Sequence, residues 1–356
     1  MNTGSSPPRT SQRLLVSLSI GFVAGAYWVY AAWANPSGVS DFDQLWAGAR
    51  ALLDGANPYA VVRANAPGPA GPFEYNLYYP LPALLVVAPF TWLPIAAARA
   101  AFCASSFGIL AFLLTRRAWY PLAGLASGAG LMTLTLAQWS GLTAAAALAP
   151  ALSLVAATKP NAHIPVLLSY RRWRAVGVSV ATGAVLFVIA FVVRPGWVGE
   201  WLGAINRDPN LRPIGFHPVG WLLLLALLRW RRQAARWILV ACFLPGTPVV
   251  YNALPLFAFP WSFRTTLVLA LLSHAAMWPP LLAAAQGVGF AAYAAVSVPS
   301  LLFLLYLPAV VFLLREPNVE VGAEVDAGRV AAAGGTLADL PDPADHSRRP
   351  SSSPTA

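Results

Sequence analysis

The sequence predicts an all-helical protein that crosses a membrane about ten to twelve times. Of its 356 residues, 58% are hydrophobic and 10% are charged, and the mean hydropathy is +0.61, whereas a soluble domain carries about 25% charged residues. The apolar residues form long runs, and a helical span needs about 20 of them. Arginines cluster between these runs, which is typical of cytoplasmic loops. Lipid is therefore the expected solvent of this chain.

The positive charge and the cysteines exclude several other classes of protein. The net charge of +10 comes from arginine clusters such as RRWR (171–174) and RWRR (229–232) between apolar runs. A nucleic-acid binder would instead carry a basic stripe on a soluble fold. Cys103 and Cys242 lie in apolar runs and have the spacing of neither a disulfide framework nor a zinc site. We expect no nucleic-acid partner, no metal and no cofactor.

The chain divides into three parts. Residues 1–13 are expected as a cytoplasmic N-terminus and residues 14–314 as the transmembrane domain. Residues 315–356 are rich in Ala, Gly, Pro, Ser and acidic residues, so we expect a disordered cytoplasmic tail. The first apolar run, 14–34, is longer than the core of a signal peptide. It is therefore expected to remain as the first helix.

Several of the candidate spans are short or broken by proline, and such pieces can be half-spans. The candidates are about 14–34, 78–94, 96–115, 119–137, 141–157, 160–170, 175–194, 218–228, 234–249, 250–261, 265–285 and 288–314. Crossing at each of them places two hydrophilic loops outside, at about 35–77 and 195–217. It also places Arg116 and Arg117 outside, against the positive-inside pattern, so the assignment is weakest around 78–117.

The carboxylates of the transmembrane domain lie in the two expected external loops. None lies within a candidate span, where an ionised group is expensive and often marks an ion or proton pathway. This distribution argues against a proton-coupled transporter and favours chemistry at the outer membrane–water interface. The residues are Asp41, Asp43, Asp54, Glu74, Glu200 and Asp208.

The first external loop contains a predicted amphipathic helix on the membrane surface. In SDFDQLWAGARALLDGANPY (40–59), Ser40 or Asp41 is the N-cap, apolar residues follow at helical spacing, and DGANPY ends the helix. The helix would present Asp41 and Asp43 near the end of the first span. The alternative for either aspartate is a helix cap with solvated neighbours. Tyr79 and its neighbouring tyrosines are interfacial aromatics or a platform for a sugar or polyprenyl headgroup.

Three motifs in order carry a resemblance to a known family. They are SDFDQLWAGARALLDGANPY, then YNLYYPLPALLVVAPFTWLP, then LTLAQWSGL with the later TKPNAHIP. With this order and spacing, residues 14–175 resemble the polyprenol-phosphate-mannose-dependent mannosyltransferases, glycosyltransferase family 87 of the GT-C superfamily. That family has an Asp-Phe pair, a Gly-x-x-Pro-Tyr stop, a Tyr-Pro-Pro-like start of the next span, a Gly-Gln turn and a Lys-Pro element.

The resemblance implies a GT-C-like fold and roles for particular residues. Asp41 corresponds to the acid of the first external loop, the general base, and Lys159 with Pro160 matches the Lys-Pro element. The chain departs from the family in three places. The Tyr-Pro-Pro element reads YYPLP from Tyr79, and the Gly-Gln turn reads AQWSG, so only Gln138 matches. The later external loop reads NRDPNLRPIGFHPVGW in place of an Asn-rich stretch.

The expected mechanism is direct displacement at the anomeric carbon of a lipid-phosphate sugar. Asp41 would remove the proton of the acceptor hydroxyl, with Asp43 as the runner-up or orienting partner. Lys159 is the single lysine among 23 basic residues, and its compact charge suits a phosphate; the alternative is a lysine that caps a helix end. Further candidates to stabilise the leaving phosphate are Arg207, Arg212 and His217, with Arg50 and Arg63 as fallbacks. For His217 the alternative is an interfacial histidine.

The sequence therefore predicts an integral-membrane glycosyltransferase. By the resemblance it transfers a hexose, mannose in that family, from a polyprenyl-phosphate sugar to a glycolipid or glycan acceptor. Its site would face outside, because the acids lie in the expected external loops. The membrane is expected to be the plasma membrane of a bacterium, because few lysines with many alanines and arginines are typical of a GC-rich bacterial genome. The alternative is a polytopic transporter or lipid-sugar flippase, favoured by the proline-broken stretch 244–260. A non-catalytic scaffold has no specific support.

Overall fold

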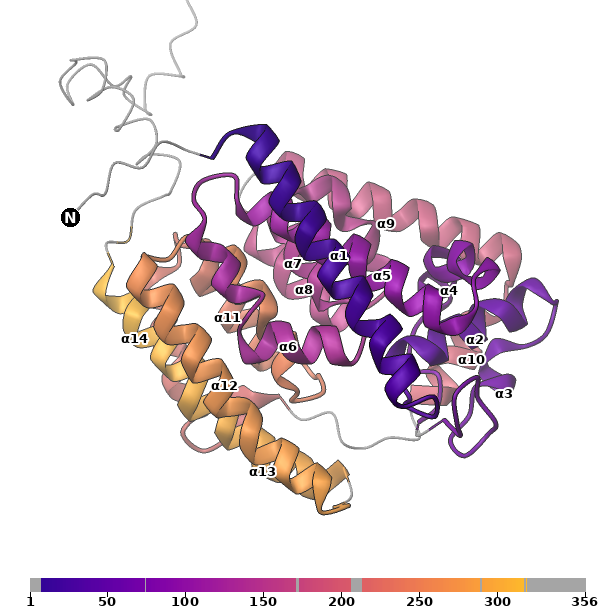
Figure 1. The fold of residues 1–356 in the computed structure, drawn as a ribbon. Coiled ribbons are helices and arrows are strands. Elements are labelled where there is room, and N and C mark those ends of the chain that lie inside the picture. The colour runs from indigo at the N-terminus through magenta and orange to yellow at the C-terminus, as the bar shows by residue number, and fades with distance from the viewer. Residues whose placement is uncertain are drawn as a thin grey trace, which may run out of the picture.

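The structure is a computed structural model, and it describes residues 8–73, 75–170, 173–205, 213–288, 290–316 and 318. All regular secondary structure in these residues is helical (Figure 1). Five helical segments among them are long and apolar enough to cross a membrane. They are α1 (Thr10–Ala34), α5 (Ile95–Leu114), α9 (Trp173–Val193), α12 (Phe263–Ala285) and the run Ala291–Arg315. The expected helical membrane protein is thus confirmed at this level.

The other apolar runs fold as shorter helices, so the described residues do not contain ten to twelve full-length spans. Prolines and tight turns interrupt these runs, because a proline lacks the N–H that a helix interior needs. The run Ala291–Arg315 comprises α13 (Phe290–Leu301), η7 (Leu302–Tyr306) and α14 (Leu307–Arg315). The hydrophilic loops contain α2 (Asp41–Leu53), α3 (Pro58–Val61), α10 (Trp197–Ile205) and η4 (Ile214–Phe216). The remaining elements are α4 (Leu81–Val87), η1 (Ala88–Trp92), η2 (Tyr120–Gly124), α6 (Gly128–Thr135), α7 (Ser140–Leu148), η3 (Pro150–Ala157), α8 (Pro160–Ser169), η5 (Gly220–Arg229), α11 (Gln233–Phe243) and η6 (Val250–Ala258).

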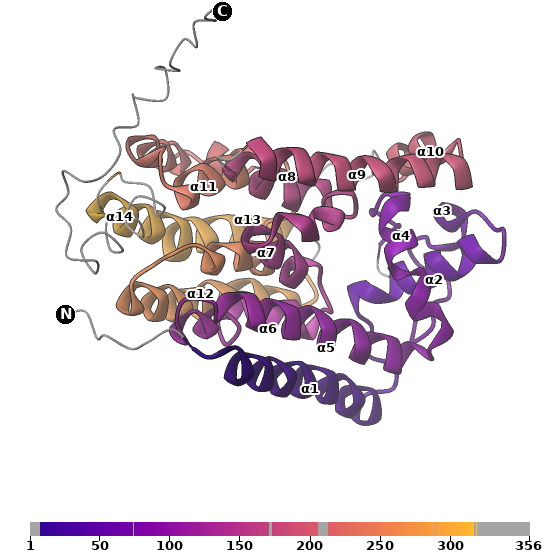
Figure 2. The same ribbon diagram turned by 90° about the horizontal axis from the view of Figure 1, so that it is seen from above.

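Helices α1 and α5 lie side by side and antiparallel over most of their length (Figures 1 and 2). Small residues permit this close approach. A Cβ on Gly21 would lie 2.7 Å from the backbone oxygen of Ala104, and one on Gly108 would lie 3.3 Å from the oxygen of Ser17. Packing through small residues is the usual way in which helices associate within a membrane.

We expect Gly21→Ala to destabilise the protein by about 1–3 kcal/mol, because the new methyl group meets backbone and not a movable side chain. The matched control is Gly177→Ala in α9, where a Cβ meets nothing within 4 Å. There alanine is expected to be neutral or to stabilise by up to about 1 kcal/mol. Thermal unfolding of both variants in the same detergent measures the difference. Equal melting temperatures would contradict the tight α1–α5 contact.

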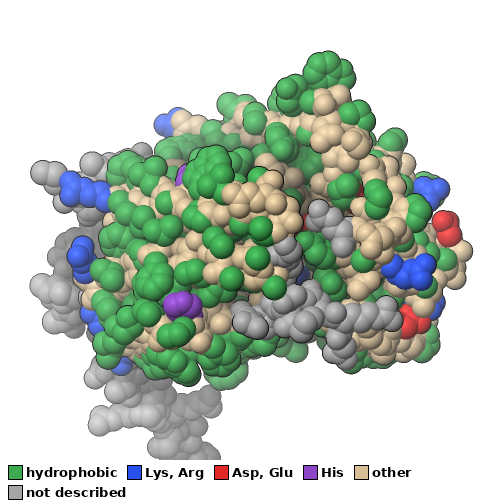
Figure 3. All heavy atoms as spheres, turned by 90° about the horizontal axis from the view of Figure 1, so that it is seen from below, with side chains coloured by type: hydrophobic (Ala, Val, Ile, Leu, Met, Phe, Trp, Pro, Cys, Tyr) green, Lys and Arg blue, Asp and Glu red, His purple; other side chains and the backbone are tan. Residues whose placement is uncertain are grey.

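The surface between the two ends of the molecule is apolar. Large side chains of α1 and α9 point outward, with Phe22 76% exposed and Val192 79% exposed. Figure 3 shows hydrophobic side chains over most of this face and charged side chains near its ends. Soluble monomers rarely expose an apolar surface of this extent. It fits a protein whose sides contact lipid.

The expected span at 78–94 is wrong, and this correction removes the violation at Arg116 and Arg117. The stretch folds as the short helices α4 and η1, which pack beside α2. Helix α5 therefore starts at the end of the molecule where α2 lies, and it runs back along α1. At its far end the Arg13 guanidinium donates to the Phe112 oxygen (2.7 Å). Arg116 and Arg117 thus lie at the same end as Arg13, as the positive-inside pattern requires.

The two expected external loops meet at the opposite end, where Figure 2 shows α2, α3, α4 and α10. The Trp201 indole of α10 donates to the Tyr78 oxygen (2.9 Å), which joins the second loop to the first. An ion pair between Arg194 and Glu200 (2.7 Å) holds the start of α10. The cytoplasmic tail expected from residue 315 lies outside the described residues from 319 onward.

Candidate functional site

Helix α2 begins as the sequence predicts, with Ser40 as its N-cap. The Ser40 hydroxyl donates to Asp43 Oδ1 (2.8 Å), and the Ser40 N–H donates to Asp43 Oδ2 (3.0 Å). The Asp43 carboxylate thus accepts both bonds from Ser40 and satisfies the backbone N–H of the N-cap, as the acid does in a capping box. It fixes Asp41 as the first residue of the helix, at the end of the molecule where the two loops meet.

Asp43 forms a buried ion pair with Arg99 of α5. The Arg99 Nε donates to Asp43 Oδ1 (2.7 Å) and Nη2 donates to Oδ2, and the side chains are 3% and 0% exposed. The guanidinium also lies 5.1 Å from the ring of Trp28. With both oxygens engaged and no exposed surface, Asp43 anchors α2 to α5, and the geometry favours an anchoring role over the role of alternative base.

Arg99 is a functional neighbour that the sequence reasoning missed. A signal was present, because Arg99 lies inside the apolar run 96–115, and a charged residue within a span is expected to have a partner. The sequence did not indicate which acid pairs with it. The antiparallel return of α5 along α1, after the short α4, decides that the partner is Asp43.

Asp41 belongs to a second polar cluster, separate from the Asp43–Arg99 pair. The Gln138 amide nitrogen donates to Asp41 Oδ2, and the Gln138 amide oxygen accepts from Lys159 Nζ (3.0 Å). The Tyr79 hydroxyl donates to the same amide oxygen (3.4 Å). Four residues that are far apart in the sequence therefore meet through one amide. Asp41 is half-buried, and Gln138 and Lys159 are buried.

The turn that carries Gln138 has a left-handed backbone. Ala137, between α6 and α7, has φ 49° and is buried. This region favours glycine, because a Cβ is crowded there. The Ala in AQWSG thus occupies a glycine-type conformation. Strained residues of this kind persist where the surroundings fix them, often at functional sites.

Lys159 is held between aromatic rings at the N-terminal end of α8. Its Nζ lies 4.6 Å from the ring centroid of Tyr251 and 5.9 Å from that of Tyr79. Burial lowers the pKa of Lys159 to about 8, and the negative charge of Asp41 opposes that shift. A cation is electrostatically unfavourable at the N-terminus of a helix, so capping α8 does not explain this lysine. Together the helix end and the ammonium form a positive site suited to an anion.

The remaining candidate residues lie away from this cluster or outside the described residues. His217 accepts from the Val219 N–H (3.3 Å), packs against Phe303 (5.8 Å between rings), and lines a different, apolar cavity beside α13. Arg50 is exposed and lies 3.9 Å from Asp54, and Arg63 is exposed. Arg207 and Arg212 lie outside the described residues. In the part of the chain that is described, no three His, Cys, Asp or Glu side chains gather as metal ligands.

Fold and site define a helical membrane protein that holds a carboxylate, an amide and a lysine together where its two hydrophilic loops meet. No family model matches the chain, and no curated protein or solved structure matches it.

Proposed function

We propose that the protein is an integral-membrane glycosyltransferase. It transfers a hexose, mannose by the sequence resemblance, from a polyprenyl-phosphate sugar to a hydroxyl of a glycolipid or glycan on the outer side of a bacterial plasma membrane. One observation carries the proposal, namely that Gln138 joins the half-buried carboxylate of Asp41 to the buried ammonium of Lys159. A proton acceptor and a phosphate-binding cation are the two groups that this reaction needs.

The reaction is a single displacement. The acceptor oxygen forms a bond to the anomeric carbon while the bond from that carbon to the phosphate oxygen breaks. Asp41 takes the proton of the acceptor hydroxyl, and the polyprenyl phosphate leaves with the electron pair of the broken bond. The charge that develops on the phosphate is stabilised by Lys159 and the N-terminus of α8.

Gln138 acts as a positioning residue. Its amide has one donor end and one acceptor end, and the donor end holds Asp41 while the acceptor end holds Lys159 and Tyr79. An ionised carboxylate in its place would repel Asp41, and an apolar side chain would leave a buried ammonium with one polar partner fewer. The strained turn at Ala137 supports this role, because it fixes where the amide points.

A transporter or flippase for lipid-linked sugars is the second candidate. The stretch 244–260 favours it, because residues 244–249 lack helical hydrogen bonding over most of their length before η6 begins. Broken helices often form substrate sites in transporters. This candidate requires movement of an unchanged lipid-linked sugar, whereas the enzyme requires a new glycosidic bond.

Transfer from a radiolabelled polyprenyl-phosphate hexose to an alkyl glycoside acceptor tests the proposal, with the purified protein in nanodiscs. The enzyme is expected to give a labelled alkyl disaccharide and free polyprenyl phosphate in equal amounts, and a nucleotide-sugar donor is expected to give none. Transbilayer movement of the intact donor in proteoliposomes, with no product, would favour the flippase. Absence of product from a panel of polyprenyl-phosphate hexoses would contradict the enzyme.

The rate of transfer is expected to fall as the pH rises through about 8, the pKa of Lys159. The pKa lies below that of a free lysine, so the ammonium is fully charged only below this pH and loses its hold on the phosphate above it. The Lys159→Arg variant, which stays protonated, is expected to be slower but to lack this fall. The measurement is kcat/KM between pH about 6 and 9.5, and the same alkaline limb in both proteins would assign it to another group.

A further inference from the structure

The backbone at Tyr78 and Tyr79 is held by two aromatic side chains from other segments. The Trp201 indole of α10 donates to the Tyr78 oxygen (2.9 Å), and the Tyr59 hydroxyl of α3 donates to the Tyr79 oxygen (3.2 Å). Figure 2 shows α3, α4 and α10 gathered at this end of the molecule. Because the two bonds engage successive carbonyl groups, they fix both the position and the direction of the chain that leads into α4.

Tyr79 connects this held segment to the polar cluster. Its hydroxyl donates to the Gln138 amide oxygen (3.4 Å), and its ring centroid lies 5.9 Å from Lys159 Nζ. The ring is therefore part of the wall that shields the ammonium from water. Burial is the largest cause of the lowered pKa of Lys159, about 8, and the charge of Asp41 opposes it. The position of Tyr79 thus bears on the charge of the lysine.

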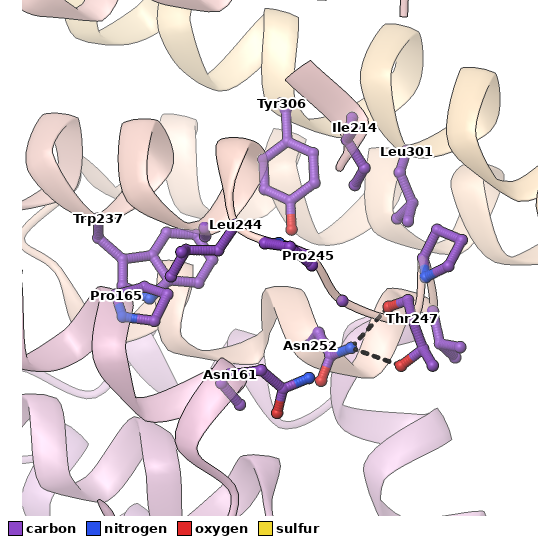
Figure 4. Close-up of a pocket in the computed structure, with 15 residues that line it drawn as sticks. Asn161, Pro165, Ile214, Trp237, Leu244, Pro245, Thr247, Asn252, Leu301 and Tyr306 are labelled. Atoms are coloured by element: carbon purple, nitrogen blue, oxygen red, sulfur yellow. Dashed lines mark hydrogen bonds between the residues drawn. The ribbon is translucent and has the colours of Figure 1, made fainter. Parts of the chain in front are cut away.

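The opposite wall of the lysine site is formed by Tyr251, whose ring centroid lies 4.6 Å from Lys159 Nζ. The next residue, Asn252, donates to the Thr247 backbone oxygen (2.9 Å), which holds the start of η6 (Figure 4). This bond lies within residues 247–252, so it is expected to persist when the Tyr79 side is loosened. Loosening that side would admit water beside Lys159 and leave the lysine in place.

The two donors are themselves seated by their surroundings. The Trp201 ring packs against the buried ring of Trp197 (5.9 Å between centroids), and the Arg194–Glu200 pair holds the start of the same helix. Burial raises the pKa of the Tyr59 hydroxyl, and the negative charge of Glu200 raises it further. This hydroxyl therefore stays protonated and remains a donor throughout the pH range in which the protein would work.

We propose that Tyr59 and Trp201 are positioning residues, which place Tyr79 against Lys159 and Gln138 by holding two successive carbonyl groups. Helices from both hydrophilic loops thereby set the surroundings of the phosphate-binding lysine, which neither loop contains. The inference rests on the proposed function for what the lysine binds. The packing around the lysine, in contrast, can be measured without any substrate.

Tyr59→Phe is the first test, because it removes the hydroxyl and keeps the buried ring. Lys159 is the single lysine among 23 basic residues, so protein grown with isotope-labelled lysine gives one lysine side-chain signal in NMR. Titration of this signal in detergent micelles, without substrate, measures the pKa of Lys159. In the variant we expect this pKa to rise from about 8 toward that of a free lysine, because water beside the ammonium favours its charged form.

The variant is also expected to lower kcat for sugar transfer by about three- to tenfold, the effect of one lost hydrogen bond. The alkaline limb of its pH profile is expected to move to higher pH together with the pKa of Lys159. A loss of folded protein alone would lower the rate without moving this limb. Thermal unfolding of the same samples measures the folded fraction.

Trp201→Phe is the second variant, since it keeps an aromatic ring and removes the N–H donor, and it is expected to raise the pKa of Lys159 as well. Tyr120→Phe is the matched control. The Tyr120 hydroxyl also donates to a backbone oxygen, that of Trp261 (2.7 Å), but it follows Arg117 by three residues at the other end of the molecule. There the same change is expected to leave the pKa of Lys159 unchanged.

A pKa of Lys159 that stays at about 8 in both Tyr59→Phe and Trp201→Phe would overturn the inference. An equal rise in Tyr120→Phe would also overturn it, because the effect would then not depend on the carbonyl groups beside the site. If the pKa shifts as expected while the wild-type protein transfers no sugar, the positioning of Tyr79 is supported and the proposed function fails instead.

Discussion

Replacing Asp41 by asparagine is expected to lower the rate of sugar transfer by about 10²- to 10⁴-fold, the usual contribution of a general base. The asparagine side chain has nearly the same shape, and its oxygen can still accept from the Gln138 amide. The local structure is thus expected to persist while the proton acceptor is lost. The measurement is kcat/KM for transfer from the polyprenyl-phosphate hexose, with thermal unfolding recorded on the same sample.

Asp54→Asn is the matched control for this experiment. Asp54 follows α2 at its other end, and its side chain is 66% exposed beside Arg50. The same chemical change there is expected to leave transfer within about twofold of wild type, since exposed pairs contribute little. A folded Asp41→Asn protein with wild-type transfer would remove Asp41 from the role of base.

Removing the Asp43 carboxylate is expected to destabilise the fold by about 3–5 kcal/mol, because Asp43→Ala leaves the buried guanidinium of Arg99 without its partner. The double variant Asp43→Leu/Arg99→Met removes both charges and is expected to recover much of that loss. Folded Asp43→Ala protein is expected to keep a turnover number close to that of wild type. The measurements are unfolding by denaturant in mixed micelles and turnover per folded molecule.

The matched control is Glu200→Ala at the Arg194–Glu200 pair, whose side chains are 27% and 28% exposed. Loss of this pair is expected to cost at most about 1 kcal/mol, because solvent can replace the missing partner. If Asp43→Ala is no more destabilising than Glu200→Ala, the buried anchor is refuted. A large fall in turnover with unchanged stability would return Asp43 to the role of an alternative base.

Much of the fold could be predicted from local pattern. The apolar runs at 14–34, 96–115 and 175–194 correspond to the long helices α1, α5 and α9, because a helix in lipid needs only length and apolar composition. The start of α2 followed from Ser40 or Asp41 as the N-cap before apolar residues at helical spacing. The predicted span at 78–94 was wrong, because prolines interrupt this run and it packs beside α2 as two short helices.

The sequence indicated which residues belong to the candidate site, but it did not indicate how they contact one another. Motif order pointed to Asp41, Gln138, Lys159 and Tyr79, and the structure brings these residues into contact. It places His217 in another cavity. The structure also pairs Asp43 of α2 with Arg99 of α5. This pair depends on how the two helices pack, which the pattern of residues within either helix does not reveal.

By itself the sequence determined that this protein is helical, that it has apolar runs long enough to cross a membrane, and that the acids before residue 315 lie in two hydrophilic loops. The physical reason is that composition and spacing decide which segments favour lipid and which favour water. Only the tertiary structure decided that one aspartate binds an amide and a lysine while its neighbour two residues away is locked to an arginine. The physical reason is that α2 is a helix, so Asp41 and Asp43 point in different directions and meet different partners. Which partners they meet depends on how α5, α7 and α8 return to the same end of the molecule.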